Sequence, residues 1–140
     1  MWLAEGTGAA DAWLEHIDRD YDSPAILVPT VVLTEVITGY PADASTNRFL
    51  KMIDDPQEPG AFYLDLTKET ATRAGVLRTE ALRVVGLDRK RLISATDAHV
   101  VALAEERSTR HAVTIVTSDP GDMELLVGLT GRTNISVLGI

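Results

Sequence analysis

Short apolar runs alternate with helical patterns along this sequence, and that alternation constrains the fold more than any other feature. Runs rich in apolar or β-branched residues predict buried strands at 25–28, 61–66, 112–117 and 135–139. Helical patterns lie around them, at 8–18, 30–39, 44–53, 68–85, 95–107 and 120–129. Such alternation predicts a parallel sheet with helices on both faces. We therefore expect an α/β fold, a three-layer α/β/α sandwich around a mostly parallel sheet.

The size and composition of the chain point to one globular domain over 1–140. Its 140 residues are enough to build a hydrophobic core. No apolar run approaches the roughly 20 residues that cross a bilayer, and the N-terminus lacks the basic and apolar stretches of a signal peptide. The absence of cysteine fits a reducing compartment. These features predict a cytoplasmic protein that does not insert into a membrane.

Basic residues are few but clustered. The formal net charge of −8 argues against general affinity for nucleic acid, because phosphate contacts need grouped Lys and Arg. A local exception is the run DRKRL at 88–92, which contains Arg89, Lys90 and Arg91. These side chains come shortly before an acidic helix start and could guide a phosphate backbone toward it. A solvated loop is the equal alternative.

Several helices carry N-terminal signals. N-caps are expected at Thr30, Thr67, Ser94 and Asp119. The sequence from Ser94 to Asp97 has the pattern of a capping box, which places Asp97 at the third helical position. Asp119 is followed by Pro120 at the first helical position and by Asp122 in the first turn. We therefore expect Asp119 and Asp122 to cap a helix.

Acidic residues occupy comparable places in separate segments. Glu35 lies about one turn into a helix that follows a strand, Asp97 opens a helix, and Asp119 ends a strand. Ligand sites of parallel sheets lie beyond the carboxyl ends of the strands. An all-carboxylate set there suits Mg²⁺ or Mn²⁺, which can activate water and stabilise a phosphoryl transition state. Each acid taken alone also has a structural explanation, as a capping group or an exposed helical glutamate.

Three segments together resemble acidic motifs of a nuclease family. VPTVVLTEV at 28–36, ATDAHVVALA at 95–104 and VTIVTSDPGDMELL at 113–126 are similar to the second, third and fourth acidic motifs of the PIN domain, the fold of VapC-type toxin ribonucleases. The likeness runs from about Ala25 to Ile140, in the same order and with family-like spacing. The resemblance implies a Mg²⁺- or Mn²⁺-dependent endoribonuclease that hydrolyses RNA phosphodiester bonds and is usually paired with a small antitoxin protein.

The resemblance also implies residue roles and partners. By that likeness Glu35, Asp97 and Asp119 are expected to be catalytic and to bind the metal, with Asp122 as a fourth ligand or a neighbour of the ligands. Ser118 is expected to be a polar neighbour of the site that contacts RNA. The expected partners are an RNA substrate, an antitoxin and a second copy of the chain.

The first acidic motif of that family is not found in this sequence. Family members begin with a strand that carries the first acid, whereas Met1 already stands at the edge of the first expected helix. That strand lies in the middle of the family's sheet, so its loss removes a ligand and leaves backbone groups of both neighbours unpaired. An N-terminally truncated PIN-like domain is therefore expected. Three explanations are open: a start codon assigned too far downstream, a truncated inactive remnant, or replacement of the missing acid by Glu5 or Asp11.

Two functions follow from these explanations. With the missing segment present in the native protein, the chain is expected to be a ribonuclease. The alternative is a degenerate, non-catalytic PIN-like domain that acts as a binding partner.

Overall fold

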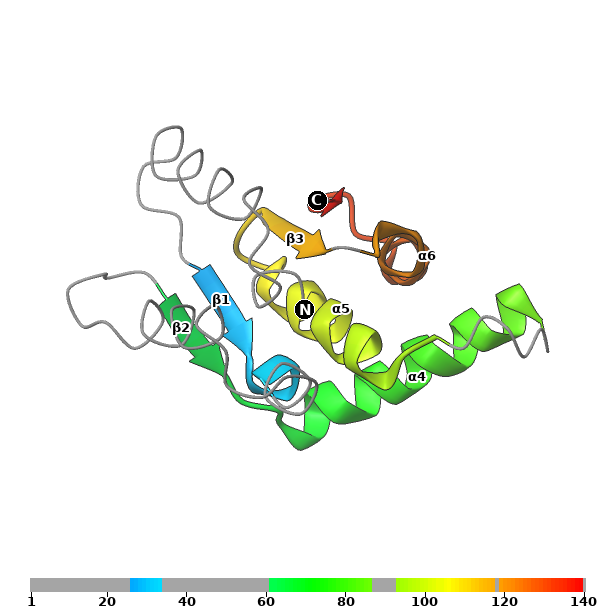
Figure 1. Cartoon of the computed structure of the whole chain (residues 1–140), viewed down its shortest axis with the longest axis horizontal. Coiled ribbons are helices and arrows are strands. Elements are labelled where there is room, and N and C mark those ends of the chain that lie inside the picture. Colours follow the sequence, from blue (N-terminus) through cyan, green and yellow to red (C-terminus); the bar gives the residue numbers. More distant parts are fainter. Residues whose placement is uncertain (1–25, 34–60, 87–92, 118, 140) are drawn as a thin grey trace, which may run out of the picture. The chain divides into compact units, whose positions relative to one another are not determined.

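The computed structural model describes residues 26–33, 61–86, 93–117 and 119–139 (Figure 1). The chain divides into two compact units, one of residues 1–65 and 140 and the other of residues 66–139. The described elements are, in chain order, β1 (Ile26–Pro29), β2 (Ala61–Leu64), α4 (Lys68–Val85), α5 (Ala95–Arg107), β3 (Val113–Thr117), α6 (Pro120–Thr130) and β4 (Ile135–Gly139). The described part is therefore mixed α/β, as the alternation predicted.

The described part of the first unit contains one pair of parallel strands. β1 pairs with β2 from Ile26 opposite Ala61 to Pro29 opposite Leu64, and the side chains of Val28 and Leu64 are buried. The prediction that the first strand ends before Pro29 is wrong, because Pro29 is its last paired residue. A proline lacks the N–H that continues a ladder, so the end of a strand is a position where it fits.

A helix follows β1 directly. Residues 30–33 are helical, so Thr30 is already the first helical residue and the predicted N-cap is displaced by one position. The Thr30 hydroxyl donates to the carbonyl oxygen of Leu64 at 3.3 Å, which ties the helix start to the end of β2. The remainder of this helix and the helices expected at 8–18 and 44–53 lie outside the described residues.

The second unit opens with α4, whose predicted bounds are confirmed. The Thr67 hydroxyl caps the helix by accepting a hydrogen bond from the N–H of Thr70 at 3.1 Å. Its buried residues follow the spacing of one helical face, at Thr70, Ala74, Leu77 and Ala81. The helix ends at Gly86, whose φ of 75° is a backbone conformation that glycine adopts without steric cost.

The remaining helices and strands build one core with α4. The predicted bounds of α5 are confirmed, and α6 runs one residue further than expected. The core is formed by Ala74, Leu77, Ala81, Ile93, Ala98, Val101, Ala102, Ala104, Ile115, Met123, Leu126, Val127 and Ile135. None of the helices in the described segments has both the length and the apolar character needed to span a membrane.

β3 and β4 form a second parallel pair, from Val113 opposite Ile135 to Thr117 opposite Gly139. One face of the pair carries Ile115 and Ile135 into the core. On the other face the hydroxyls of Thr114 and Ser136 are hydrogen bonded at 3.0 Å and exposed. Parallel pairing, predicted from the sequence, is thus confirmed in both described sheets.

Candidate carboxylate site

Asp97 lies in the first turn of α5, and neighbouring groups fix this helix start. The Ser94 hydroxyl accepts hydrogen bonds from the N–H groups of Thr96 and Asp97, at 3.0 and 3.4 Å. The Ile93 side chain is fully buried, and its carbonyl oxygen accepts a hydrogen bond from Nε of Arg78 on α4 at 2.9 Å. The predicted cap at Ser94 is confirmed. One residue earlier, the hydrogen bond from Arg78 to Ile93 attaches the start of α5 to α4.

Asp119 follows β3 and occupies the N-cap position of α6, with Pro120 at the first helical position as predicted. Its side chain, however, makes no capping hydrogen bond, so the prediction that the Asp119 carboxylate caps this helix is wrong. Instead the Asp119 backbone N–H donates to the Thr117 hydroxyl at 3.1 Å, which turns the chain between strand and helix. The Asp119 side chain is exposed. Its carboxylate is therefore not committed to holding the helix.

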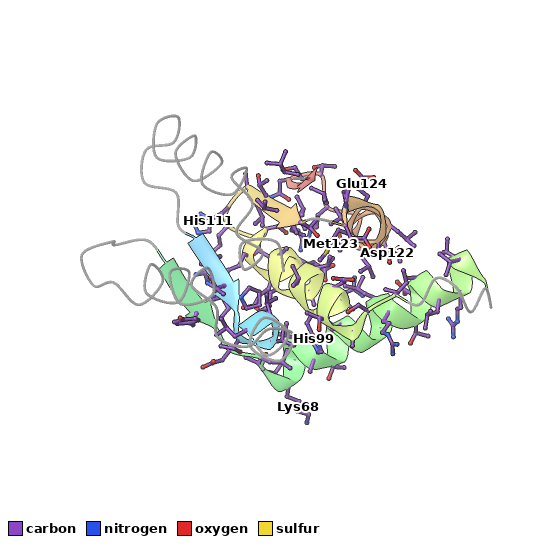
Figure 2. All side chains as sticks on the ribbon, in the orientation of Figure 1. Lys68, His99, His111, Asp122, Met123 and Glu124 are labelled. Carbon is purple, nitrogen blue, oxygen red and sulfur yellow. The ribbon has the colours of Figure 1, made fainter. Side chains whose placement is uncertain are left out.

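Asp122 lies in the first turn of α6, as predicted. An acid there is stabilised by the positive end of the helix dipole. The residue is half-buried and engaged in a polar or electrostatic interaction, which distinguishes it from the exposed Asp119. Figure 2 labels Asp122 beside α6. Asp122 therefore has a structural role that would exist without any ligand.

Asp97 and Asp119 lie at the same end of two consecutive elements. α5 and β3 are joined by residues 108–112 and run in opposite directions (Figure 1). The first turn of α5 consequently lies at the end where β3 finishes. This is also the carboxyl end of β4, because β3 and β4 are parallel. Ligand sites of parallel sheets are found at this end.

Within the described segments, no group of three or more His, Cys, Asp or Glu side chains could hold a metal ion. Asp97, Asp119 and Asp122 thus do not form such a group by themselves. The remaining expected ligand, Glu35, lies outside the described residues. The donor chemistry suits Mg²⁺ or Mn²⁺, since carboxylate oxygens are their preferred ligands and the Asp119 carboxylate is exposed.

Other expected site residues also lie outside the described residues, namely Ser118, Arg89, Lys90, Arg91, Glu5 and Asp11. Two histidines are described. His111 is exposed in the turn before β3. His99 lies two positions after Asp97, and its Nδ1 is buried without a hydrogen-bond partner in the described part of the chain. Neither belongs to a metal-binding group there.

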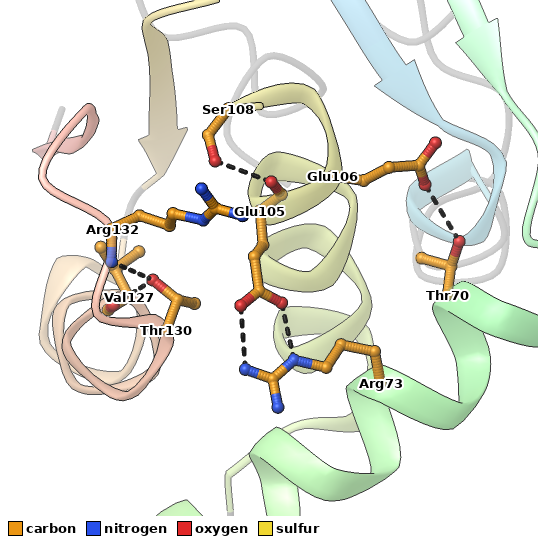
Figure 3. A network of polar contacts seen from close by, with 8 residues as sticks. All are labelled: Thr70, Arg73, Glu105, Glu106, Ser108, Val127, Thr130 and Arg132. Atoms are coloured by element: carbon orange, nitrogen blue, oxygen red, sulfur yellow. Dashed lines mark hydrogen bonds and ion pairs between the residues drawn. The ribbon is translucent and has the colours of Figure 1, made fainter. Parts of the chain in front are cut away.

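A polar network joins the far end of α5 to α4 (Figure 3). Arg73 pairs with Glu105, and the Thr70 hydroxyl donates to Glu106 Oε2 at 3.4 Å. The hydrogen bond to Glu105 raises the pKa of Arg73, and the negative charges of Glu105 and Glu80 act in the same direction against burial. This network holds the end of α5 on α4, and the hydrogen bond from Arg78 to the Ile93 carbonyl oxygen holds its start on the same helix.

Two side chains that position these elements have no local signal in the sequence. Arg78 reaches the Ile93 carbonyl, and Asn134 Nδ2 donates to the carbonyl oxygens of Ser108 and His111 at 2.7 and 3.0 Å. Both contacts join segments that are separated along the chain. No local pattern predicts such pairs.

Comparison of the chain with protein-family models and with curated proteins finds no match, and comparison with solved structures finds none either. The structure places Asp97 and the uncommitted carboxylate of Asp119 at the carboxyl end of a parallel strand pair.

Proposed function

We propose that the chain is a metal-dependent endoribonuclease of the PIN type, which hydrolyses RNA phosphodiester bonds with Mg²⁺ or Mn²⁺. The observation that carries the proposal is the placement of Asp97 and Asp119 at the same end of α5 and β3. The exposed Asp119 carboxylate adds support, because helix capping does not explain it. The order of the acidic motifs supplies the substrate class.

The proposal assigns metal binding to Glu35, Asp97 and Asp119, with Asp122 beside them. A bound Mg²⁺ or Mn²⁺ would supply activation of water and stabilisation of the phosphoryl transition state. The carboxylates of this chain would fix the metal and orient the attacking water. The confirmed parallel pairing supports the proposal of a three-layer PIN-like sandwich.

The proposal includes the partners and the setting that the resemblance implies. RNA would be guided by the basic run from Arg89 to Arg91 and contacted at Ser118. A small antitoxin protein and a second copy of the chain are the proposed protein partners, and the cytoplasm is the proposed compartment.

A second candidate is a non-catalytic PIN-like domain that acts as a binding partner. The observation that favours it is that the described acids do not form a group of three. The two candidates differ in whether the folded chain cleaves RNA.

The test is cleavage of single-stranded RNA by the purified full chain with Mn²⁺, compared with the same reaction in EDTA. We expect Asp119→Asn and Asp97→Asn each to lower the rate by at least about 10-fold, since even groups that support metal ligands matter that much. Glu124→Gln is the matched control, because Glu124 is an exposed acid on α6. Calorimetric titration should show weaker Mn²⁺ binding in the two aspartate variants and unchanged binding in Glu124→Gln.

Each outcome separates the candidates. Cleavage that persists in EDTA, or in both aspartate variants, would exclude the carboxylate–metal mechanism. A folded wild-type chain that neither binds Mn²⁺ nor cleaves RNA would support the non-catalytic candidate.

A further inference from the structure

Near the end of α5, acidic and basic side chains balance in the sequence but have different partners in the structure. Glu105 and Glu106 are followed closely by Arg107 and Arg110, so the segment looks neutral. In the structure both acids reach toward α4, where Glu105 holds Arg73 and Glu106 accepts a hydrogen bond from the Thr70 hydroxyl (Figure 3). Both acids are therefore engaged with α4.

The basic side chains of the same region remain exposed. Arg107, Arg110 and His111 are joined by turn hydrogen bonds, from the N–H groups of Arg110 and His111 to the Arg107 carbonyl oxygen, each at 3.1 Å. None of these side chains has a carboxylate partner in the described segments. The negative end of the α5 dipole explains a basic residue at Arg107 but not the others.

A third arginine comes from a different loop. Asn134 binds the carbonyl oxygens of Ser108 and His111, which fixes the loop after α6 against the turn after α5. Arg132, two residues earlier in that loop, is exposed and extends toward the end of α5 (Figure 3). Like Arg107 and Arg110, it has no carboxylate partner in the described part of the chain.

We propose that Arg107, Arg110 and Arg132, together with His111, form a binding surface for the phosphate backbone of RNA. We call this set the arginine corner. Guanidinium groups bind phosphate oxygens through paired hydrogen bonds. A polyanion therefore suits three arginines that have no carboxylate partner among the described residues and whose backbone segments are joined by the Asn134 hydrogen bonds. On a chain with a net charge of −8, such a corner provides local attraction that the whole molecule lacks. The proposal rests on the proposed function for the identity of the polyanion.

The surroundings of the arginine corner favour nucleic acid over an acidic protein. Protein interfaces centre on buried apolar or aromatic side chains, whereas nucleic-acid interfaces are polar and positively charged. The large apolar side chains exposed in the second unit lie elsewhere, at Leu66, Val76, Val84 and Leu138. The corner itself has the polar neighbours Thr109, Thr133 and Asn134.

The arginine corner lies at the opposite end of α5 from Asp97. Arg107 follows Asp97 by ten helical positions, which corresponds to about 15 Å along the helix. His111 and Asp122, labelled in Figure 2, likewise lie at opposite ends of this part of the molecule. The corner would therefore hold RNA that flanks the cleaved bond, so it should affect binding of the substrate more than the rate of the bound complex.

The test compares two variants with the same loss of charge. Arg110→Gln with Arg132→Gln removes two guanidinium groups from the arginine corner, and Lys68→Gln with Arg83→Gln removes two exposed basic groups from α4. Binding of a fluorescein-labelled single-stranded RNA to the full chain is measured in EDTA between about 50 and about 200 mM salt. In the corner variant we expect the slope of log Kobs against log[salt] to become shallower by about 1.4, because each lost phosphate contact contributes about 0.7. The α4 variant should retain the wild-type slope.

Equal slopes in the two variants would overturn the proposal. It would also be overturned if the corner variant lost binding of poly-glutamate while its binding of RNA stayed unchanged. Cleavage with Mn²⁺ is measured separately. If the corner variant binds RNA more weakly but the wild-type chain does not cleave RNA, the ribonuclease proposal is rejected and the proposed RNA-binding surface is supported. If cleavage depends on Asp97 and Asp119 but the corner variant keeps the wild-type salt slope, the proposed surface is rejected and the ribonuclease proposal is supported.

Discussion

Arg73 and Glu105 join α4 to α5 through two parallel hydrogen bonds, from Nε to Oε2 at 2.6 Å and from Nη2 to Oε1 at 2.9 Å. This paired geometry matches the planar guanidinium to the carboxylate and raises the pKa of Arg73. A group whose pKa is raised by folding stabilises the protein at every pH below its unfolded pKa. For Arg73 this contribution is lost only as the pH rises through the strongly alkaline range.

Replacing Arg73 with Lys should weaken this connection while keeping the charge. Lysine supplies one hydrogen bond to the carboxylate where arginine supplies two, so we expect Arg73→Lys to lower the free energy of unfolding by about 0.5–1 kcal/mol. The value is modest because the Arg73 side chain is 36% exposed and solvent screens the pair. Urea unfolding at about pH 7 and about pH 9 should give the same difference, given the direction of the pKa shift. Lys68→Arg, at an exposed position of α4, is the control and should be neutral; an equal effect of both changes would show that the paired geometry does not matter.

The two confirmed N-caps allow stability to be separated from metal binding. Ser94→Ala and Thr67→Ala each remove a side-chain acceptor at a helix start and should each cost about 1 kcal/mol. Only Ser94 caps the helix that carries Asp97. We therefore expect Ser94→Ala alone to weaken Mn²⁺ binding in calorimetric titration, at a temperature where both variants are folded. Equal Mn²⁺ affinity in the two variants would argue against a role of Asp97 as a ligand.

A glycine within α6 and the glycine that caps its end should respond to alanine in opposite directions. Gly131 caps the helix with a φ of 68°, and a side chain there meets the steric cost of the left-handed region, about 1–2 kcal/mol. Gly128 lies within the helix with nothing within 4 Å of an added Cβ, so Gly128→Ala should stabilise by about 0.5–1 kcal/mol. Thermal unfolding should show a lower Tm for Gly131→Ala and a higher Tm for Gly128→Ala. A rise in Tm for both would contradict the assigned cap.

Asn134 should be sensitive to loss of its amide group. Its Nδ2 holds two carbonyl oxygens of the turn after α5, so Asn134→Asp would place a carboxylate against those acceptors. We expect a loss of about 2–3 kcal/mol in urea unfolding, because the carbonyl groups lose their donor and face a charge. Thr133→Ala is the neighbouring exposed control and should change stability by less than about 0.5 kcal/mol. Equal effects at both positions would show that the amide does not hold the turn.

The helices of the second unit were predictable because local signals define their ends. Thr67 and Ser94 are caps in the sequence and in the structure, and Gly86 follows the last residue of α4. The same reasoning wrongly predicted that the Asp119 side chain caps α6. A side chain that has the right type and position for a cap still needs the right backbone, and Asp119 has a ψ of 80° with no capping hydrogen bond.

The parts that could not be predicted depend on contacts between distant segments. Arg78 and Ile93 are 15 residues apart, and Asn134 and Ser108 are 26 residues apart. Neither pair leaves a periodic pattern, because each contact involves one long or polar side chain and a backbone carbonyl. For the same reason the segment from Glu105 to His111 looks neutral in the sequence, and only the packing of α5 on α4 separates its charges.

The short span of the β3–β4 pairing has a consequence for how the second unit folds. Val113 pairs with Ile135 across only 22 residues, with α6 as the intervening segment. Closing so small a loop costs little chain entropy, and contacts of low sequence separation form quickly. This strand–helix–strand segment is therefore suited to act as an early folding nucleus on which α4 and α5 dock.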